Sequence, residues 1–247
     1  MPDSFPLTHL LNQLFGAILA AGFHALGAPA DQAAAKAAAV LSTFSLEVLA
    51  VAGLMTFFVI VRLTLSVENP NPAQQIAEMI HEVIGSQAEQ VMGHGYERFQ
   101  AYVTSIFLFV LINNLLGVIP GVHGPTASIM VTLGLAVPTF LYYNFYGLRT
   151  HGPVGYLKQF AGPIWWMAWL VFPIEVFSNL ARILSLSVRL YANMFAGDLV
   201  TLVFFSLCPI LVPAVFLAFH VAISVIQAFV FMLLTMIYLS LATAHDH

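Results

Sequence analysis

Residues 185–198 place an arginine inside an otherwise apolar helical stretch, Ser-Leu-Ser-Val-Arg-Leu-Tyr-Ala-Asn-Met-Phe-Ala-Gly-Asp. A guanidinium keeps its proton at physiological pH, and placing it near the centre of a bilayer costs roughly 2.5–3.5 kcal/mol on insertion scales. It therefore needs a polar partner or a water-filled cavity, and intramembrane arginines mostly mark ion pathways. Arg189 is the first candidate functional residue, with a purely structural ion pair as the alternative.

Polar residues recur on the face of the helix that carries this arginine. Glu175, Arg182 and Arg189 are seven residues apart, so they stack on one side of a helix. The same face carries Ser178, Ser185 and Asn193. We expect one polar stripe along an apolar helix.

The following apolar segment carries a second polar face, made by His220, Ser224 and Gln227 and continued by Phe231 and Tyr238. Asp198 lies about 13 Å beyond Arg189 along the first helix, at 1.5 Å per residue. The two faces predict an aqueous or proton-conducting path that reaches a central cation from each side of the membrane.

Each of these residues has a plainer interpretation. Glu175 and Arg182 either line a channel or form a helix-stabilising pair. A lone histidine in a helix is usually a satisfied core residue, but Gln227 and Asp198 beside His220 favour the pathway.

Three further polar residues lie in the predicted spans. Asn113 and Asn114 are expected to make hydrogen bonds between helices. Glu47 is expected near the outer end of the first span, where its side chain would reach water.

The composition predicts a membrane protein. Hydrophobic residues make up 60% of the chain and charged residues only 7%, with a mean hydropathy of +0.92, whereas soluble domains carry about 25% charged residues. The single Cys208 excludes an internal disulfide, and no His or Cys cluster has zinc-ligand spacing, so we expect no metal and no cofactor. A net charge of −4 gives no basic surface for nucleic acid.

The predicted fold is an all-α integral membrane protein with about five transmembrane helices. Prolines 120 and 125 separate the second span from the third, and prolines 209 and 213 separate the fourth from the fifth. The last two spans would run about 60 and 50 Å, against a hydrocarbon core of about 30 Å, so we expect them to be strongly tilted or bent. Such helices suggest a wall around an object outside this chain. The expected spans are 41–64, 99–120, 126–147, 164–206 and 209–243.

Two other segments complete the organisation. Residues 1–40 are expected to form an extracytoplasmic segment, with a helix at the interface or packed on the bundle, and 41–247 form the membrane domain. Between the first two spans, Asn71, Pro72 and Gly93 delimit an amphipathic helix with an acidic polar face, expected to lie flat on the cytoplasmic surface. That face is either solvated or a docking surface for a partner.

The cations predict the orientation. With five spans, Arg62, Arg98, Arg149 and Lys158 share one side of the membrane and Lys36 lies on the other. By the positive-inside rule the four-cation side is cytoplasmic. We therefore expect the N-terminus outside and the C-terminus in the cytoplasm.

Several motifs together resemble the a subunit of F-type ATP synthases, the ATPase subunit 6 family. The arginine motif contributes Arg189-Leu190, Asn193 and Ala196-Gly197 followed by an acid. The resemblance runs from about residue 41 to the end, although the family often has Glu at 198 and Asp and Asn where this chain has Ser128 and Met130. The other matching segments are 173–175 (Pro-Ile-Glu), 114–120 (Asn-Leu-Leu-Gly-Val-Ile-Pro), 125–133 (Pro-Thr-Ala-Ser-Ile-Met-Val-Thr-Leu), His220 and 227–239 (Gln-Ala-Phe-Val-Phe-Met-Leu-Leu-Thr-Met-Ile-Tyr-Leu).

The resemblance implies a stator in the membrane Fo sector of a bacterial cell membrane. The object outside the chain would be a ring of c subunits with membrane-buried carboxyl groups. Arg189 would favour deprotonation of a ring carboxyl and separate two half-channels. The partners would be the c-ring, the b subunits of the peripheral stalk, the F1 sector indirectly, and lipid. The outer half-channel would contain Asn193, Asp198, His220 and Gln227, and the cytoplasmic one Glu175 and Arg182, with Ser185 on the same path.

Two other function classes remain as alternatives. An ion-coupled secondary transporter would also place charges at the midplane, but this chain shows no internal repeat with paired broken helices. An intramembrane hydrolase would need a motif such as His-Glu-x-x-His or Gly-x-Ser-x-Gly, and neither occurs. The phosphate-loop motif Gly-x-x-x-x-Gly-Lys is absent too, so we expect no ATPase activity from this chain alone.

Overall fold

The chain is built from helices in the part that the structure, a computed structural model, describes. That part comprises residues 6–25, 27, 29–66, 70–93, 95–119, 124–161, 168–207 and 211–243. No strand occurs among these residues. The elements are α1 (Pro6–Ala25), α2 (Ala30–Leu63), α3 (Pro72–Met92), α4 (Glu97–Leu116), the 3-10 turn η1 (Pro125–Ala127), α5 (Ile129–Ala161), α6 (Ala168–Leu207) and α7 (Leu211–Thr243).

Five of these helices are long and apolar enough to cross a membrane, which confirms the predicted number of spans. The first begins earlier than expected, because α2 starts at Ala30 and runs through residue 40 without a break. The predicted breaks at Pro120 and Pro209 lie outside the described residues. The candidate spans are Gln32–Leu63, Glu97–Leu116, Ile129–Gly152, Trp169–Ser206 and Ala214–Thr243.

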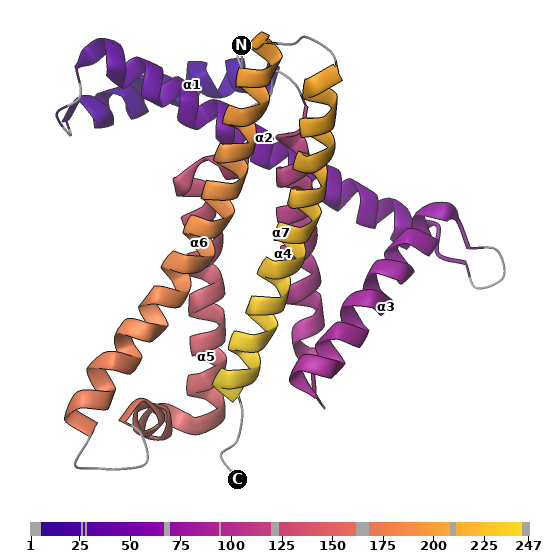
Figure 1. The fold of residues 1–247 in the computed structure, drawn as a ribbon, viewed down its shortest axis with the longest axis vertical. Coiled ribbons are helices and arrows are strands. Elements are labelled where there is room, and N and C mark those ends of the chain that lie inside the picture. Colours follow the sequence, from indigo (N-terminus) through magenta and orange to yellow (C-terminus); the bar gives the residue numbers. More distant parts are fainter. Residues whose placement is uncertain are drawn as a thin grey trace.

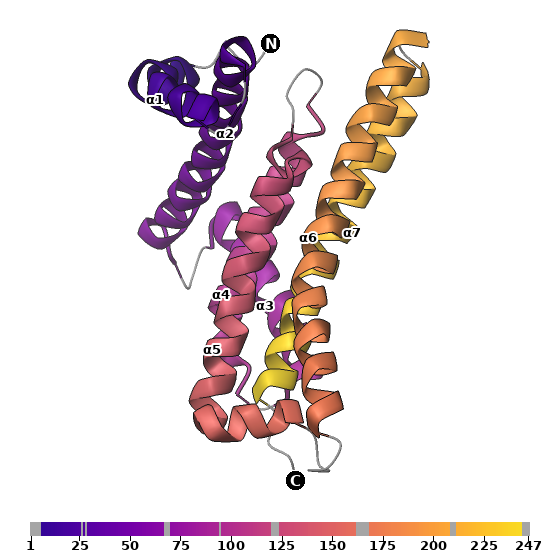
Figure 2. The ribbon, with the colours of Figure 1, turned by 90° about the vertical axis from the view of Figure 1, so that its left-hand side faces the viewer.

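The helices form two groups. In Figure 1, α6 and α7 run as a long antiparallel pair beside α4 and α5. Figure 2 shows α1 and α2 on the other side of α4 and α5 from that pair. The predicted N-terminal helix is present as α1, which packs on α2, where the hydroxyls of Thr8 and Ser45 are 2.8 Å apart.

Two apolar clusters hold the central helices together. Ile84, Phe99 and Met236 belong to a cluster shared by α3, α4, α5 and α7. Val110 and Leu190 belong to a second, shared by α4, α6 and α7. In a bilayer the lipid tails are as apolar as leucine side chains. Close packing between the helices, rather than removal of apolar surface from water, therefore supplies most of the stabilisation of the bundle.

The amphipathic helix is confirmed as α3. It ends at Gly93, whose φ of 68° suits a residue without a side chain. At its other end the structure corrects one detail, because the Asn71 side chain makes no capping hydrogen bond and only its carbonyl accepts one, from the Gln75 backbone N–H at 3.0 Å.

A kink at Gly152 divides α5. The φ of this residue is 71°, a backbone conformation that residues with side chains rarely adopt. The residues beyond it turn back against the bundle, so that Tyr156 packs on Gly147. The structure thereby supplies a short returning segment after Gly152 that the sequence did not predict.

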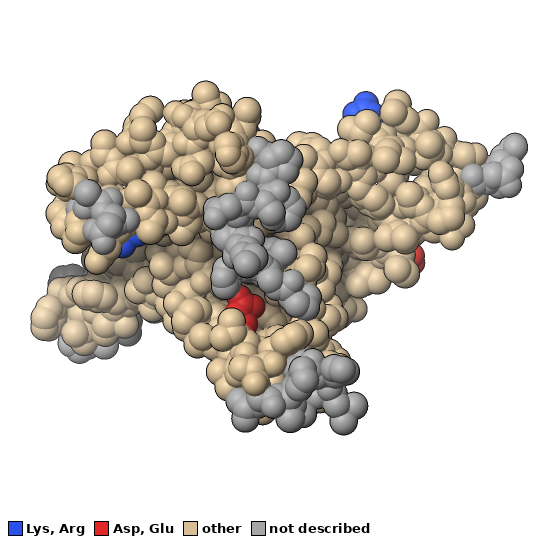
Figure 3. All heavy atoms as spheres, turned by 90° about the horizontal axis from the view of Figure 1, so that it is seen from above, with Lys and Arg blue, Asp and Glu red and all other residues tan. Residues whose placement is uncertain are grey.

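The last two helices have the excess length that the sequence predicts. The 40 residues of α6 and 33 of α7 correspond to about 60 and 50 Å, more than the membrane requires. Their tilt in the membrane stays a prediction. Seen from above, the end face shown in Figure 3 carries very few charged side chains among the described residues.

Candidate functional site: polar residues along α6 and α7

Arg189 lies on the exposed face of α6. Its neighbours Leu186 and Leu190 are buried in the core, which fixes the rotation of the helix. Within the described residues no hydrogen bond or ion pair is found for the guanidinium. The alternative interpretation, a structural ion pair of Arg189 inside this chain, therefore lacks an acidic partner among the described residues.

The surface around Arg189 suits a closely packed apolar partner. One turn away from it on the exposed face of α6 lie Ser185, Ala192 and Asn193, and Ala196 follows one turn further. Next to them stands Val188, which is 47% exposed. Small residues let another helix approach closely in a membrane. A guanidinium in such a surface needs an acid from outside the chain, or water, to satisfy it.

Asn193 and Gln227 meet between α6 and α7, as the two predicted polar faces require. The Asn193 side-chain amide donates a hydrogen bond of 2.8 Å to Oε1 of Gln227. Gln227 is buried, and its own amide nitrogen has no partner among the described residues. A donor left over in this position can bind water or a group of a partner.

Asp198 and His220 also face each other across the helix pair. Nε2 of His220 lies 4.0 Å from Oδ1 of Asp198. The histidine is only 3% exposed, and its Nε2 has no hydrogen-bond partner among the described residues. It lines a cavity of about 420 Å³, together with Asn193 and Thr201.

Gly197 makes this approach possible. A Cβ at this position would lie 3.0 Å from both Cε1 and Nε2 of His220. Because Gly197 has no side chain, the imidazole of His220 can lie directly against the backbone of α6, close to Asp198.

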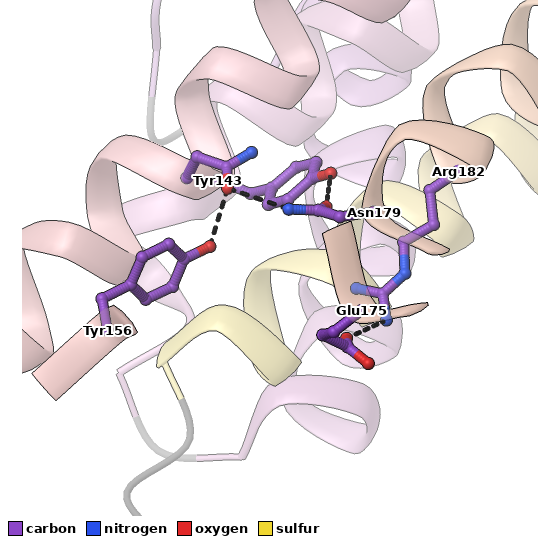
Figure 4. Close-up of polar contacts among 6 residues, drawn as sticks. Tyr143, Tyr156, Glu175, Asn179 and Arg182 are labelled. Atoms are coloured by element: carbon purple, nitrogen blue, oxygen red, sulfur yellow. Dashed lines mark hydrogen bonds and ion pairs between the residues drawn. The ribbon is translucent and has the colours of Figure 1, made fainter. Parts of the chain in front are cut away.

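Glu175 and Arg182, predicted either to line a channel or to form a helix-stabilising pair, do form an ion pair. Arg182 Nη2 lies 3.5 Å from Glu175 Oε1 (Figure 4), and the guanidinium carbon lies 5.5 Å from the ring centre of Tyr238. Both charged residues also line a small cavity of about 140 Å³. Pairing and cavity lining therefore occur together.

A hydrogen-bonded network beside this pair was missed by the sequence analysis. The Tyr143 hydroxyl donates to Oδ1 of Asn179 at 2.6 Å. The Asn179 amide and the Tyr156 hydroxyl both donate to Oδ1 of Asn144, at 3.2 and 2.7 Å (Figure 4). Burial raises the pKa of the Tyr156 hydroxyl, which further favours the protonated form that donates this hydrogen bond. The only sign of this network in the sequence is the occurrence of two asparagines, Asn144 and Asn179, within apolar spans.

A third set of polar groups is buried between α4, η1 and α7. Asn114 donates a hydrogen bond of 3.3 Å to the Ser224 carbonyl, which confirms its predicted interhelical role. Asn113 instead bonds within its own helix, to the Phe109 carbonyl at 2.8 Å. The side-chain oxygens of Asn113, Asn114 and Thr126 are buried without a partner in the described chain. Such groups ordinarily bind internal water.

Among the described residues, no three His, Cys, Asp or Glu side chains come close enough to hold an ion. The site combines two arginines, Arg182 and Arg189, with carboxyl, imidazole and amide groups that can form hydrogen bonds.

Comparison with known proteins decides between the function classes. The model of the family "ATP synthase A chain" matches residues 43–240. This chain belongs to the ATP synthase A chain family. It is 42% identical to "ATP synthase subunit a" of Koribacter versatilis over the whole of both chains. It is 43% identical to "ATP synthase subunit a" of Solibacter usitatus, over 82% of this chain and 87% of the relative. It is 44% identical to that of Geobacter sulfurreducens, over 71% of this chain and 77% of the relative.

Membership of the ATP synthase A chain family confirms the resemblance and makes the chain a membrane component of a bacterial ATP synthase. Nothing in these matches favours a secondary transporter. The matched segment contains every candidate site residue, from Glu175 to Gln227.

Proposed function

We propose that this chain is the proton-conducting stator subunit of the Fo sector, and that it forms two half-channels against a ring of c subunits. The observation that carries the proposal is the place of Arg189. It stands on the exposed face of α6, between the Asn193–Gln227 contact on one side and the Glu175–Arg182 pair on the other.

The outer half-channel would use the cavity at His220. A water molecule could bridge the 4.0 Å between His220 and Asp198, and histidine exchanges protons near neutral pH. The proton would then pass Gln227 and Asn193, whose hydrogen bond lies one turn from Arg189. It would bind to a carboxylate of the ring as that group leaves the arginine.

Arg189 would release the proton of each arriving ring carboxyl. A permanent cation within about 4–6 Å favours the ionised form of a carboxyl group, and the ionised form cannot leave the arginine for lipid without taking up a proton. The same charge would block protons from passing directly between the half-channels.

Protons leaving the ring would follow the inner cluster. Ser185 and Arg182 lie on the same helix face as Arg189, and Arg182 and Glu175 both line the 140 Å³ cavity. Each charge that crosses the membrane brings about 2.3 kcal/mol per 100 mV, which the biased rotation of the ring converts into torque.

The proposal fixes partners and orientation. The chain would have no catalytic activity of its own, since ATP would be made in the F1 sector. The c-ring would cover Arg189, the b subunits would add the peripheral stalk, and lipid would surround the rest. Arg62, Arg98, Arg149 and Lys158 support a cytoplasmic position for the inner cluster, with the N-terminus outside.

Co-purification of the tagged full chain from membranes in a mild detergent tests this assignment. The c-ring and peripheral-stalk subunits should elute with it. Recovery of the chain alone, from membranes in which those subunits are present, would contradict the proposal.

A further inference from the structure

A second and larger cavity lies between α2 and the start of α5. Its volume is about 640 Å³, enough for several water molecules, although most of its lining residues are apolar. Glu47 is the only carboxylate among the lining residues, and Thr43, Ser128 and Tyr191 supply hydroxyl groups. None of these four residues belongs to the path proposed above.

Glu47 does not sit at the end of its helix. It lies near the middle of α2, which runs from Ala30 to Leu63, and its side chain is half-buried. No ion pair or hydrogen bond is found for it among the described residues. Lys36 lies on the same helix face about 16 Å away, too far to pair with it. A half-buried carboxylate without a partner needs water, and the cavity provides the space for it.

Buried polar residues of α4 and η1 lie next to residues that line this cavity, and one of them contacts α7. Phe109 lines the cavity, and its carbonyl accepts the hydrogen bond from Asn113. Thr126 is the buried neighbour of the cavity residue Ala127. Asn114 then reaches the backbone of Ser224, one turn of α7 from His220. The side-chain oxygens of Asn113, Asn114 and Thr126 are buried without a partner in the described part of the chain, so each can accept a hydrogen bond from water.

We propose that Glu47 is the proton-collecting carboxyl of an outer vestibule, from which protons reach His220 through water held by Asn113, Thr126 and Asn114. Glu47 binds a proton from the outer solution and returns it to the water chain, so that the group is unchanged after each transfer. An acyl chain or an apolar helix in the cavity would leave the carboxylate without solvation, which is why we assign water to it. The inference rests on the proposed function.

The test uses the complete ATP synthase in liposomes, with ATP synthesis driven by an imposed proton gradient and voltage. Glu47→Gln should lower the initial rate roughly tenfold, since a positioned proton-transfer group contributes about 10²-fold or more and water replaces part of it. Tyr191 is the only other titratable side chain in the cavity lining, so the variant has no carboxyl group left to collect protons there. The loss of rate should therefore grow as the outer pH rises and protons become scarcer. Glu47→Asp should keep most of the rate, and Glu89→Gln on α3 is the matched control.

A second readout reports the content of the cavity. In a Cys208→Ser background, a small cationic thiol reagent should label Glu47→Cys much faster than Val48→Cys, which is 38% exposed but does not line the cavity. Wild-type rates in Glu47→Gln, or equal labelling of the two cysteines, would overturn the inference. The wild-type complex in the same liposomes separates the two claims, because failure of its own proton-driven synthesis would count against the proposed function instead.

Discussion

Replacing Gly197 with alanine tests the geometry of the outer half-channel. The added Cβ would lie 3.0 Å from two atoms of the His220 ring, whereas ordinary contacts begin at 3.4 Å. The ring must therefore move by about 0.4 Å, which changes the present 4.0 Å separation from Asp198. Misplacement by about 1 Å can cost about 10²-fold in rate, so we expect coupled proton flux to fall about tenfold.

The assay is ATP-driven acidification of inverted membrane vesicles, normalised to the amount of assembled complex. Alanine favours a helix interior by about 1 kcal/mol over glycine, so Gly197→Ala should not reduce assembly. Gly53→Ala on α2 is the matched control, since a Cβ there meets nothing within 4 Å, and it should pump like wild type. Undiminished pumping by Gly197→Ala would refute the view that the His220 position sets proton flow.

Two further predictions concern the path and the topology. Asp198→Leu and His220→Leu should each strongly reduce proton conduction, and exchanging the two residues should recover part of it. Their coupling should be visible in a double-mutant cycle. Undiminished proton flux in both single variants would show that Asp198 and His220 are packing residues. Single cysteines beside Arg149 and at position 245, in a Cys208→Ser background, should be labelled only from the cytoplasmic side. Labelling of either from the outside would contradict the five-span orientation.

The sequence predicts most of the helical architecture, because the features that determine it are local. Apolar length defines five spans, and helical periodicity defines α3. The start of α2 could not be predicted, because residues 30–40 are rich in alanine, which suits a buried helix, a span and an interfacial segment equally. The return of α5 after Gly152 depends on a single backbone angle that no periodic pattern reports.

The candidate site was predictable where charge or heptad spacing marked it. Arg189 stands out because a charge in lipid is costly, and the Glu175–Arg182 pair follows from seven-residue spacing. The Tyr143–Asn179 contact joins two helices that are distant in sequence, and neutral polar residues at such contacts carry no spacing signal. Glu47 was assigned to the outer end of a span because the expected span began at residue 41, whereas α2 begins at Ala30. Its cavity could not be predicted either, because α5 and η1 complete it.

The central claim is that Arg189 couples proton flow to the ring, and the most direct measurement is ATP-driven proton pumping by membranes that contain Arg189→Ala in a fully assembled complex. The account predicts that pumping and ATP synthesis are both lost, and that Arg189→Lys rescues them poorly, because an ammonium can deprotonate and lacks the planar guanidinium. Normal ATP-driven pumping by the Arg189→Ala membranes would contradict it.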